Sequence, residues 1–194
     1  MQDQFWERGY CVIEGLLDQS KIDLVRASLD HTIANREMRE RNSGYVHGAR
    51  DEYSPAVGEL LLRHCQPAFE NALGRSLQES FAYWRVYEKG GVLKRHMDRI
   101  GCEISATVTI ARDPVDAQWP IKITDMQSNE VSVELKPGSA LLYQGHQIPH
   151  WRDPFEGNSA MQLLFHYVLK DGEYADRKFD GRGVDPVERY YEEG

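Results

Sequence analysis

The spacing of apolar residues changes near Gly74. Before this glycine, apolar residues recur at steps of three and four, which is typical of helices that bury one face. The pattern predicts one helix that begins at Asp18 or Ser20, as N-cap, and ends near Ala34. It predicts a second helix over residues 56–73. After Gly74 the period falls to about two, which predicts β-strands.

Short strands separated by turn residues are predicted for most of the second half of the chain. They cover residues 81–87, 103–110, 119–124, 131–135, 140–143 and 161–169, with shorter pieces near Val92 and Ile148 and turns at 90–91, 113–114, 128–129 and 137–139. One more strand is expected around Tyr10 and Val12. Two helices followed by about eight strands predict an α+β fold. We expect a double-stranded β-helix, or jelly roll, with the N-terminal helices packed against one sheet.

The length of 194 residues and the hydrophobic content of 41% fit one domain with one core. Its predicted parts are a helical N-terminal support over residues 1–75, a jelly-roll core over 79–170 and a surface tail over 171–194. Residues 41–55 have no clear period and are predicted to be a long loop. We expect this loop, with Tyr45, His47 and Tyr53, to cover a pocket and to decide specificity.

Charge and cysteine content narrow the class of protein. The net charge of −8 disfavours nucleic acid as a partner. Apolar runs are far shorter than the roughly 20 residues that span a bilayer, and the first residues lack a signal peptide's basic and apolar segments. We therefore expect a cytoplasmic protein without a membrane partner. Cys11, Cys65 and Cys102 contain no C-x-x-C pair, so we expect reduced thiols that act as small buried hydrophobes.

The candidate chemistry begins at His96-Met97-Asp98. Side chains at positions i and i+2 of a strand point to the same face, so an imidazole and a carboxylate can meet at one ion. His150 follows Asp98 by 52 positions, after a turn and a further strand. A jelly roll can bring that later segment beside the first. Two histidines and one carboxylate form the facial triad that binds non-haem Fe(II) and leaves coordination positions open.

Other motifs surround these three residues in a recognisable order. They are Tyr87-Glu88-Lys89-Gly90-Gly91, His96-Met97-Asp98, Pro137-Gly138-Ser139-Ala140-Leu141-Leu142-Tyr143, and His150 followed by Pro154 and Gly157. This succession, over residues 81–169, resembles the Fe(II)/2-oxoglutarate-dependent dioxygenases and, within them, the prolyl 4-hydroxylase-like group. The resemblance implies that His96, Asp98 and His150 bind Fe(II). It also implies that Tyr87 contacts the co-substrate 2-oxoglutarate.

The same resemblance implies an activity. A member of this group uses dioxygen to hydroxylate an unactivated C–H bond and releases succinate and CO2 from 2-oxoglutarate. The expected substrate is a small or peptidyl amino-acid-like molecule. Halogenating relatives have a small residue that is not a ligand at the position of Asp98, so a carboxylate there favours hydroxylation.

One departure concerns the far carboxylate of 2-oxoglutarate. The family usually has Lys or Arg about ten residues after the distal histidine. Here those positions hold Ser159, Ala160, Met161 and Gln162. Burying an unpaired carboxylate is costly, so another cation must take this role. Arg152 is the first candidate, because it lies two residues beyond His150 on the same predicted strand face, and the others are Arg85, Lys122 and Arg112.

Several residues also have simpler interpretations. His96 and Asp98 form a surface ion pair if the motif is accidental, and His146 is an alternative to His150 as the distal ligand. His166, in an apolar strand, is expected to be a hydrogen-bonded core histidine.

Two other functions stay open at this point. The missing cation favours a cupin-like metalloenzyme that does not use 2-oxoglutarate. A chance motif would leave a non-catalytic jelly-roll binding module. Arg95 or Arg99, beside the H-x-D motif, would bind an acidic group of the substrate near the iron, and the alternative is that both lie at a solvated strand end.

Overall fold

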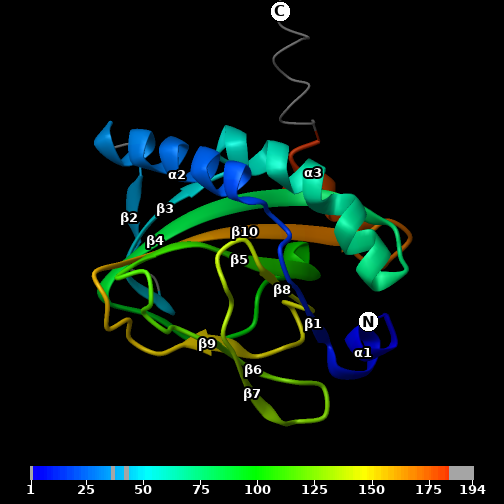
Figure 1. Cartoon of the computed structure of the whole chain (residues 1–194). Coiled ribbons are helices and arrows are strands. Elements are labelled where there is room, and N and C mark those ends of the chain that lie inside the picture. The colour runs from blue at the N-terminus through cyan, green and yellow to red at the C-terminus, as the bar shows by residue number, and fades with distance from the viewer. Residues whose placement is uncertain (1, 36–37, 42–43, 184–194) are drawn as a thin grey trace, which may run out of the picture.

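An antiparallel sheet of ten strands forms the framework of the computed structural model, which describes residues 2–35, 38–41 and 44–183 (Figure 1). The elements are α1 (Gln2–Arg8), β1 (Tyr10–Ile13), α2 (Gln19–Ala34), β2 (Arg39–Arg41), β3 (Val46–Tyr53), α3 (Ala56–Leu73), β4 (Leu77–His96), the 3-10 helix η1 (Ile100–Cys102), β5 (Ile104–Asp113), β6 (Ile121–Thr124), β7 (Glu130–Val133), β8 (Ala140–Tyr143), β9 (His150–Arg152), β10 (Ser159–Leu169) and the 3-10 segment η2 (Ala175–Gly181). The strand order is β1-β8-β5-β10-β4-β9-β6-β7, and β3 joins β2 to β4.

The sheet curls because its longest strand serves two layers. Strand β4 pairs with β10 along its first part and with β9 near its end, where His96 lies opposite His150. Strands β6, β7 and β9 thus fold back across the long strands, while α2 and α3 cover the opposite face (Figure 1). The predicted α+β double-stranded β-helix, with helices against one sheet, is confirmed.

The two long helices follow the predicted signals. Helix α2 is capped by Asp18, whose carboxylate accepts a hydrogen bond from the backbone N–H of Lys21. Helix α3 ends at Gly74, where a positive φ of 67° suits a residue without Cβ. The apolar face of α3 packs against β10, where the ring of Phe69 meets those of Phe165 and Tyr167. Burial of this face holds the helical layer on the sheet.

The predicted loop over residues 41–55 is wrong, because most of it is strand β3, paired with β4. Gly48 has a positive φ of 62°, and the register shifts between His47 and Ala49, so the alternation that marks a strand is interrupted. The predicted turn at Gly90 and Gly91 is also wrong, since both lie within β4. A Cβ on Gly91 would lie 2.6 Å from the Gly48 carbonyl oxygen, so glycine here permits close approach of two backbones.

The predicted surface tail is only partly exposed. Residues 171–183 include η2, whose Phe179 is buried and whose Asp180 binds Arg99 and the Tyr53 hydroxyl. These contacts tie the segment to β3 and to the start of η1. The rest of the predicted tail, residues 184–194, lies outside the described residues.

All three cysteines are buried and unpaired, as predicted. Burial raises the pKa of the Cys11 thiol to about 11 and that of Cys65 to about 12, so both stay protonated at neutral pH. Within the part of the chain that the structure describes, no helix is both long enough and apolar enough to cross a bilayer.

Candidate metal centre

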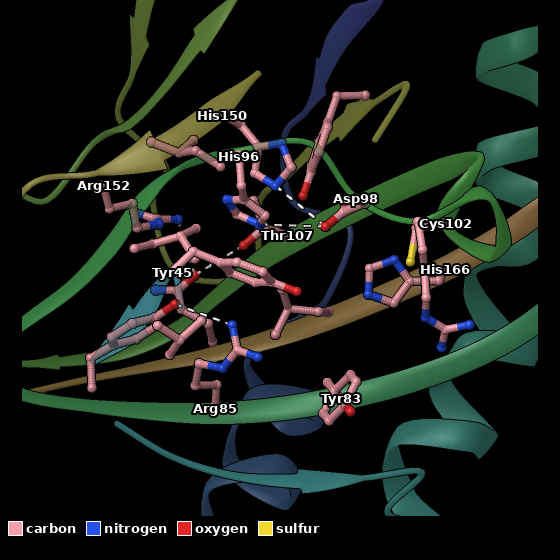
Figure 2. A pocket seen from close by; sticks show the side chains of 18 of the residues that line it. Tyr45, Tyr83, Arg85, His96, Asp98, Cys102, Thr107, His150, Arg152 and His166 are labelled. Atoms are coloured by element: carbon pink, nitrogen blue, oxygen red, sulfur yellow. Dashed lines mark hydrogen bonds and ion pairs between the residues drawn. The ribbon is translucent and has the colours of Figure 1, made fainter. Parts of the chain in front are cut away.

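His96, Asp98 and His150 converge at the point where β4 and β9 meet (Figure 2). Their ligand atoms lie within 4.8 Å of one another. The Oδ1 atom of Asp98 is 3.5 Å from Nε2 of His96 and 3.6 Å from Nε2 of His150. Because the two histidines are cross-strand partners and Asp98 follows β4 directly, the sheet register itself brings the three groups together.

Hydrogen bonds fix the orientation of both imidazole rings. Nδ1 of His96 lies 2.8 Å from the Lys94 carbonyl oxygen, and Nδ1 of His150 lies 3.0 Å from that of Ile148. A carbonyl only accepts, so each Nδ1 donates its proton, and Nε2 is the atom of each ring that can offer a lone pair to a cation. This is the arrangement that metal-binding histidines adopt.

The pKa directions of Asp98 and His150 favour an ionised carboxylate and a neutral His150 ring. Burial lowers the pKa of His150, which keeps that ring neutral. Burial alone would raise the pKa of Asp98, but the His150 and His96 side chains outweigh it, and the pKa of this carboxyl lies well below its usual range. The Nε2 atoms of the two rings and one carboxylate oxygen therefore face one another. Such a set favours a cation between them.

The second oxygen of Asp98 is already bound. Oδ2 accepts a hydrogen bond from the Ser105 hydroxyl at 3.1 Å, and the backbone N–H of Asp98 donates to the Gly145 carbonyl at 2.9 Å. Only Oδ1 faces the histidines. The carboxylate therefore offers one oxygen to the shared point.

The triad opens into a cavity whose other end holds two arginines. We call the part formed by Arg85, Tyr87, Arg152 and Gln162 the arginine end of the cavity (Figure 2 labels both arginines). Arg152 is 3% exposed and donates to the Trp119 carbonyl and, at 3.3 Å, to the Gln162 side-chain oxygen. Burial lowers its pKa to about 10, so it stays charged at neutral pH.

The four candidate cations differ in their partners. Arg85 donates to the Asp51 carboxylate at 3.2 Å and to the Tyr87 hydroxyl at 3.3 Å. Arg112 pairs with Glu134, Lys122 pairs with Asp153, and neither lines the cavity. Among the described residues, no carboxylate lies within ion-pair distance of Arg152.

Two buried donors at the arginine end have no partner among the described residues. They are Nε2 of Gln162, a residue 2% exposed, and Nε of Arg85. Unpaired buried donors are costly, and a ligand with acceptor oxygens would satisfy them. The sequence analysis named Gln162 only as lacking a charge and did not name Thr107, although both line the cavity. The available signal was the repeat of polar residues at every second position of a buried strand, namely Ser105, Thr107 and Thr109.

The remaining predicted residues lie around this cavity or outside it. His146 is not part of the triad, because its Nδ1 lies 3.3 Å from the Glu103 carbonyl oxygen and its ring packs on Tyr174. His166 is a buried, hydrogen-bonded histidine, as predicted, but it also lines the cavity. Burial lowers its pKa to about 4, so the ring is neutral at pH 7.

The predicted covering residues lie apart. Tyr45 stacks on the His96 ring with centroids 4.3 Å apart and lines the cavity. Tyr53 instead donates to Asp180, and His47 is absent from the cavity wall. Arg95 pairs with Glu130 and Arg99 with Asp180, so both charges already have partners.

Solved structures of other proteins share the fold of this chain. No family model and no curated protein matches the sequence. The structure matches a Pseudomonas putida prolyl-4-hydroxylase with a TM-score of 0.68 and 15% identity, over 85% of this chain and 95% of that one. It matches the alpha-ketoglutarate-dependent epimerase SnoN from nogalamycin biosynthesis with a TM-score of 0.71 and 15% identity, over 95% of this chain and 90% of that one.

A third similar structure is HygX from Streptomyces hygroscopicus, which holds nickel, 2-oxoglutarate and hygromycin B. Its TM-score is 0.65 at 14% identity, with 86% of each chain covered. The resemblance seen in the sequence is thus confirmed for the fold. The chain has the double-stranded β-helix fold of these three proteins.

Proposed function

We propose that this protein is an Fe(II)- and 2-oxoglutarate-dependent oxygenase. The supporting observation is that the two ends of one cavity favour ligands of opposite charge, a cation at the triad and an anion at the arginine end. The triad presents two lone pairs and a carboxylate, whereas the arginine end presents an unpaired cation and unpaired donors. A metal ion bound together with a dicarboxylate would satisfy both ends.

The donor set of the triad fits a divalent iron. His96 and His150 would each bind through Nε2, and Asp98 through Oδ1, because their other polar atoms are already hydrogen-bonded. Two imidazoles and one carboxylate are the ligands of non-haem Fe(II) oxygenases. With 2-oxoglutarate, such a metal supplies the activation of dioxygen for oxidation of a substrate, with succinate and CO2 as products.

The arginine end fits the far carboxylate of 2-oxoglutarate. We assign Arg152 as its main partner, with Tyr87 and Arg85 as further contacts. Arg152 has a planar, charged donor group that matches a carboxylate, and it is rigidly held by Trp119 and Gln162. Arg85 is already neutralised by Asp51, so its share is a hydrogen bond from the free Nε.

The proposed reaction is hydroxylation of an unactivated C–H bond in a small or peptidyl amino-acid-like substrate. The chain would hold such a substrate beside the triad, at the end of the cavity lined by Tyr45, Phe81, Tyr83 and Leu164. These side chains exclude water and restrict the position of the substrate, which directs oxidation to one bond. Retention of Asp98 as a carboxylate supports hydroxylation over halogenation.

A cupin-like metalloenzyme that does not use 2-oxoglutarate is the second candidate. The observation in its favour is Gln162, an uncharged residue in the region where the family usually places a cation. The two candidates share the metal triad and differ in what occupies the arginine end.

The direct test is conversion of 2-oxoglutarate to succinate by the wild type with Fe(II) in air, in the presence of pooled amino acids and short peptides. We expect succinate from the wild type and from His146→Ala, a matched histidine outside the triad, but none from His96→Ala. Oxygen consumption that ignores 2-oxoglutarate would favour the second candidate. Absence of metal binding would favour a binding module.

A further inference from the structure

The Ser105 hydroxyl lies between the proposed metal ligand Asp98 and the buried His166. Its Oγ atom is 3.1 Å from Oδ2 of Asp98, 2.9 Å from Nδ1 of His166 and 3.3 Å from the Cys102 carbonyl oxygen. Ser105 is fully buried and His166 is 5% exposed. Figure 2 shows His166 beside Cys102, on the side of Asp98 away from Arg152.

The direction of these hydrogen bonds follows from counting protons. A hydroxyl has one proton, and two of these three groups, the carboxylate and the carbonyl, only accept, whereas the nearby Tyr143 hydroxyl can accept or donate. If Ser105 donated to His166, its oxygen would face two acceptor oxygens without a proton between them. The proton therefore goes to Asp98, the charged acceptor, and Nδ1 of His166 donates to the Ser105 oxygen.

The backbone on the other side of Asp98 leaves no space for a different arrangement. A Cβ at Gly145 would lie 2.3 Å from the Ser105 Oγ and 2.6 Å from Oδ2 of Asp98. The Gly145 carbonyl also accepts the backbone N–H of Asp98. The carboxylate is thus held from its backbone and from its second oxygen at once.

We propose that Ser105 and His166 form a positioning relay for Asp98. The relay keeps Oδ2 bound within the protein and presents Oδ1 alone to the metal, which leaves the remaining coordination positions open. The inference rests on the proposed function, because it takes the triad as a metal site. It adds two positioning residues that act on the metal site through Asp98.

The relay also explains a second cluster of potential ligands. Asp98, Cys102 and His166 have ligand atoms within 4.8 Å of one another. Burial raises the pKa of the Cys102 thiol well above its ordinary value, so that side chain is a poor metal ligand. Nδ1 of His166 is occupied by Ser105. The relay thus accounts for the closeness of His166 to Asp98, and one ion is expected in the cavity.

The test is calorimetric titration with Mn(II) alone, which needs neither 2-oxoglutarate nor turnover. We expect Ser105→Ala to weaken Mn(II) binding by about 10- to 100-fold, the usual effect of removing such an outer partner. His166→Leu should weaken it less, since Ser105 can still donate. The double variant should match Ser105→Ala, because the effect of His166 passes through Ser105. His166→Asn, which keeps an N–H near the Nδ1 position, should restore most of the affinity.

Two controls separate positioning from general damage. Tyr167→Phe removes a buried hydrogen bond to the Leu62 carbonyl at the neighbouring position of β10, and should leave Mn(II) affinity unchanged. Thermal unfolding of the metal-free variants checks that each is folded. With Co(II) in place of Mn(II), Ser105→Ala should change the visible ligand-field bands, because release of Oδ2 alters the coordination, whereas Tyr167→Phe should not.

The outcomes are distinct. A wild type that fails to bind Mn(II) overturns the proposed metal site and the relay with it. A wild type that binds, with Ser105→Ala and His166→Leu binding equally well, overturns the relay alone. Additive effects of the two substitutions would also contradict it, since they would place His166 outside the path through Ser105.

Discussion

The two ends of the cavity differ in how completely the protein satisfies its own polar groups. At the triad, the polar atom of each side chain that faces away from the shared point has a hydrogen-bond partner. Nδ1 of His96 binds the Lys94 carbonyl, Nδ1 of His150 binds the Ile148 carbonyl, and Oδ2 of Asp98 binds the Ser105 hydroxyl. Only the three ligand atoms stay bare. At the arginine end, no carboxylate of the described residues lies within ion-pair distance of Arg152, and Nε2 of Gln162 has no acceptor among them.

This difference indicates two kinds of ligand. A site in which only the electron-pair donors are left free is prepared for a cation. A site in which a charged donor and an amide N–H are left free is prepared for an anion with several oxygens. Arg85, in the same cavity, provides the internal comparison, because Asp51 already neutralises it. The contrast between the two arginines singles out Arg152.

The largest expected effect comes from removing the cation site. His96→Ala and Asp98→Ala should each abolish 2-oxoglutarate-dependent succinate formation and the stabilisation of the protein by Mn(II), because two ligands do not replace three. Melting temperature with and without Mn(II), measured beside succinate, checks this. Normal succinate production by either variant would remove the triad from the account.

The next effect concerns the anion site. Arg152→Met should weaken 2-oxoglutarate binding by about 2–5 kcal/mol, the usual effect of truncating one partner of a buried charge pair. Binding of Mn(II) should stay close to that of the wild type. Lys122→Met is the matched control. Lys122 pairs with the exposed carboxylate of Asp153 and does not line the cavity. Equal 2-oxoglutarate affinity in wild type and Arg152→Met would exclude the assignment.

The third effect comes from placing a carboxylate at the arginine end of the cavity by a near-isosteric substitution. Gln162→Glu supplies Arg152 with a carboxylate at the place where the amide oxygen now accepts at 3.3 Å. We expect the metal-free protein to melt at a higher temperature, and 2-oxoglutarate to bind at least about tenfold more weakly, because the internal anion competes. Gln147→Glu, on the exposed surface, adds the same charge as a control. A rise in 2-oxoglutarate affinity would contradict this interpretation.

The last expected effect is confined to the metal-free protein and is a pH dependence of its stability. Burial lowers the pKa of His166 to about 4, below the ordinary 6.5, so the unfolded chain binds more protons than the folded one between these values. The contribution of the neutral His166 ring to the free energy of unfolding is fully present above pH 6.5 and is lost as the pH falls toward 4. Between pH 7 and pH 5 the loss should be about 2 kcal/mol. His166→Asn should show a shallower pH dependence in urea unfolding, while the contribution of His150, whose pKa burial also lowers, stays in both proteins. Equal pH dependence in both would contradict the expected role of His166.

Sequence reasoning located the features that depend on local spacing. The helices followed from the apolar period and from Asp18 and Gly74, and the triad followed from an i, i+2 pair and a distal histidine. Arg152 followed from the same strand rule applied to His150. The helices and the convergence of these side chains on one cavity are observed, because each prediction uses the geometry of one element, whereas the roles of the triad and of Arg152 stay predictions.

Features that depend on contacts between distant strands were not predictable in this way. Strand β3 was missed because Gly48 interrupts its alternation, and its reason, the close approach of Gly91, appears only when β3 and β4 pair. The contact of Ser105 with His166 joins positions 61 residues apart. The sequence showed Gln162 only as an uncharged residue where the family usually has a cation. Its contact with Arg152 forms only when the sheet curls.

The most direct test of the account is an anaerobic titration of the metal-free protein with Fe(II) and then with 2-oxoglutarate, followed by visible absorption. We predict the weak charge-transfer band of an iron-chelated keto acid in the wild type and its absence in His96→Ala. Arg152→Met should reach the same band only at higher 2-oxoglutarate concentration. Iron binding without this band in the wild type would contradict the use of 2-oxoglutarate and favour a metalloenzyme with a different co-substrate.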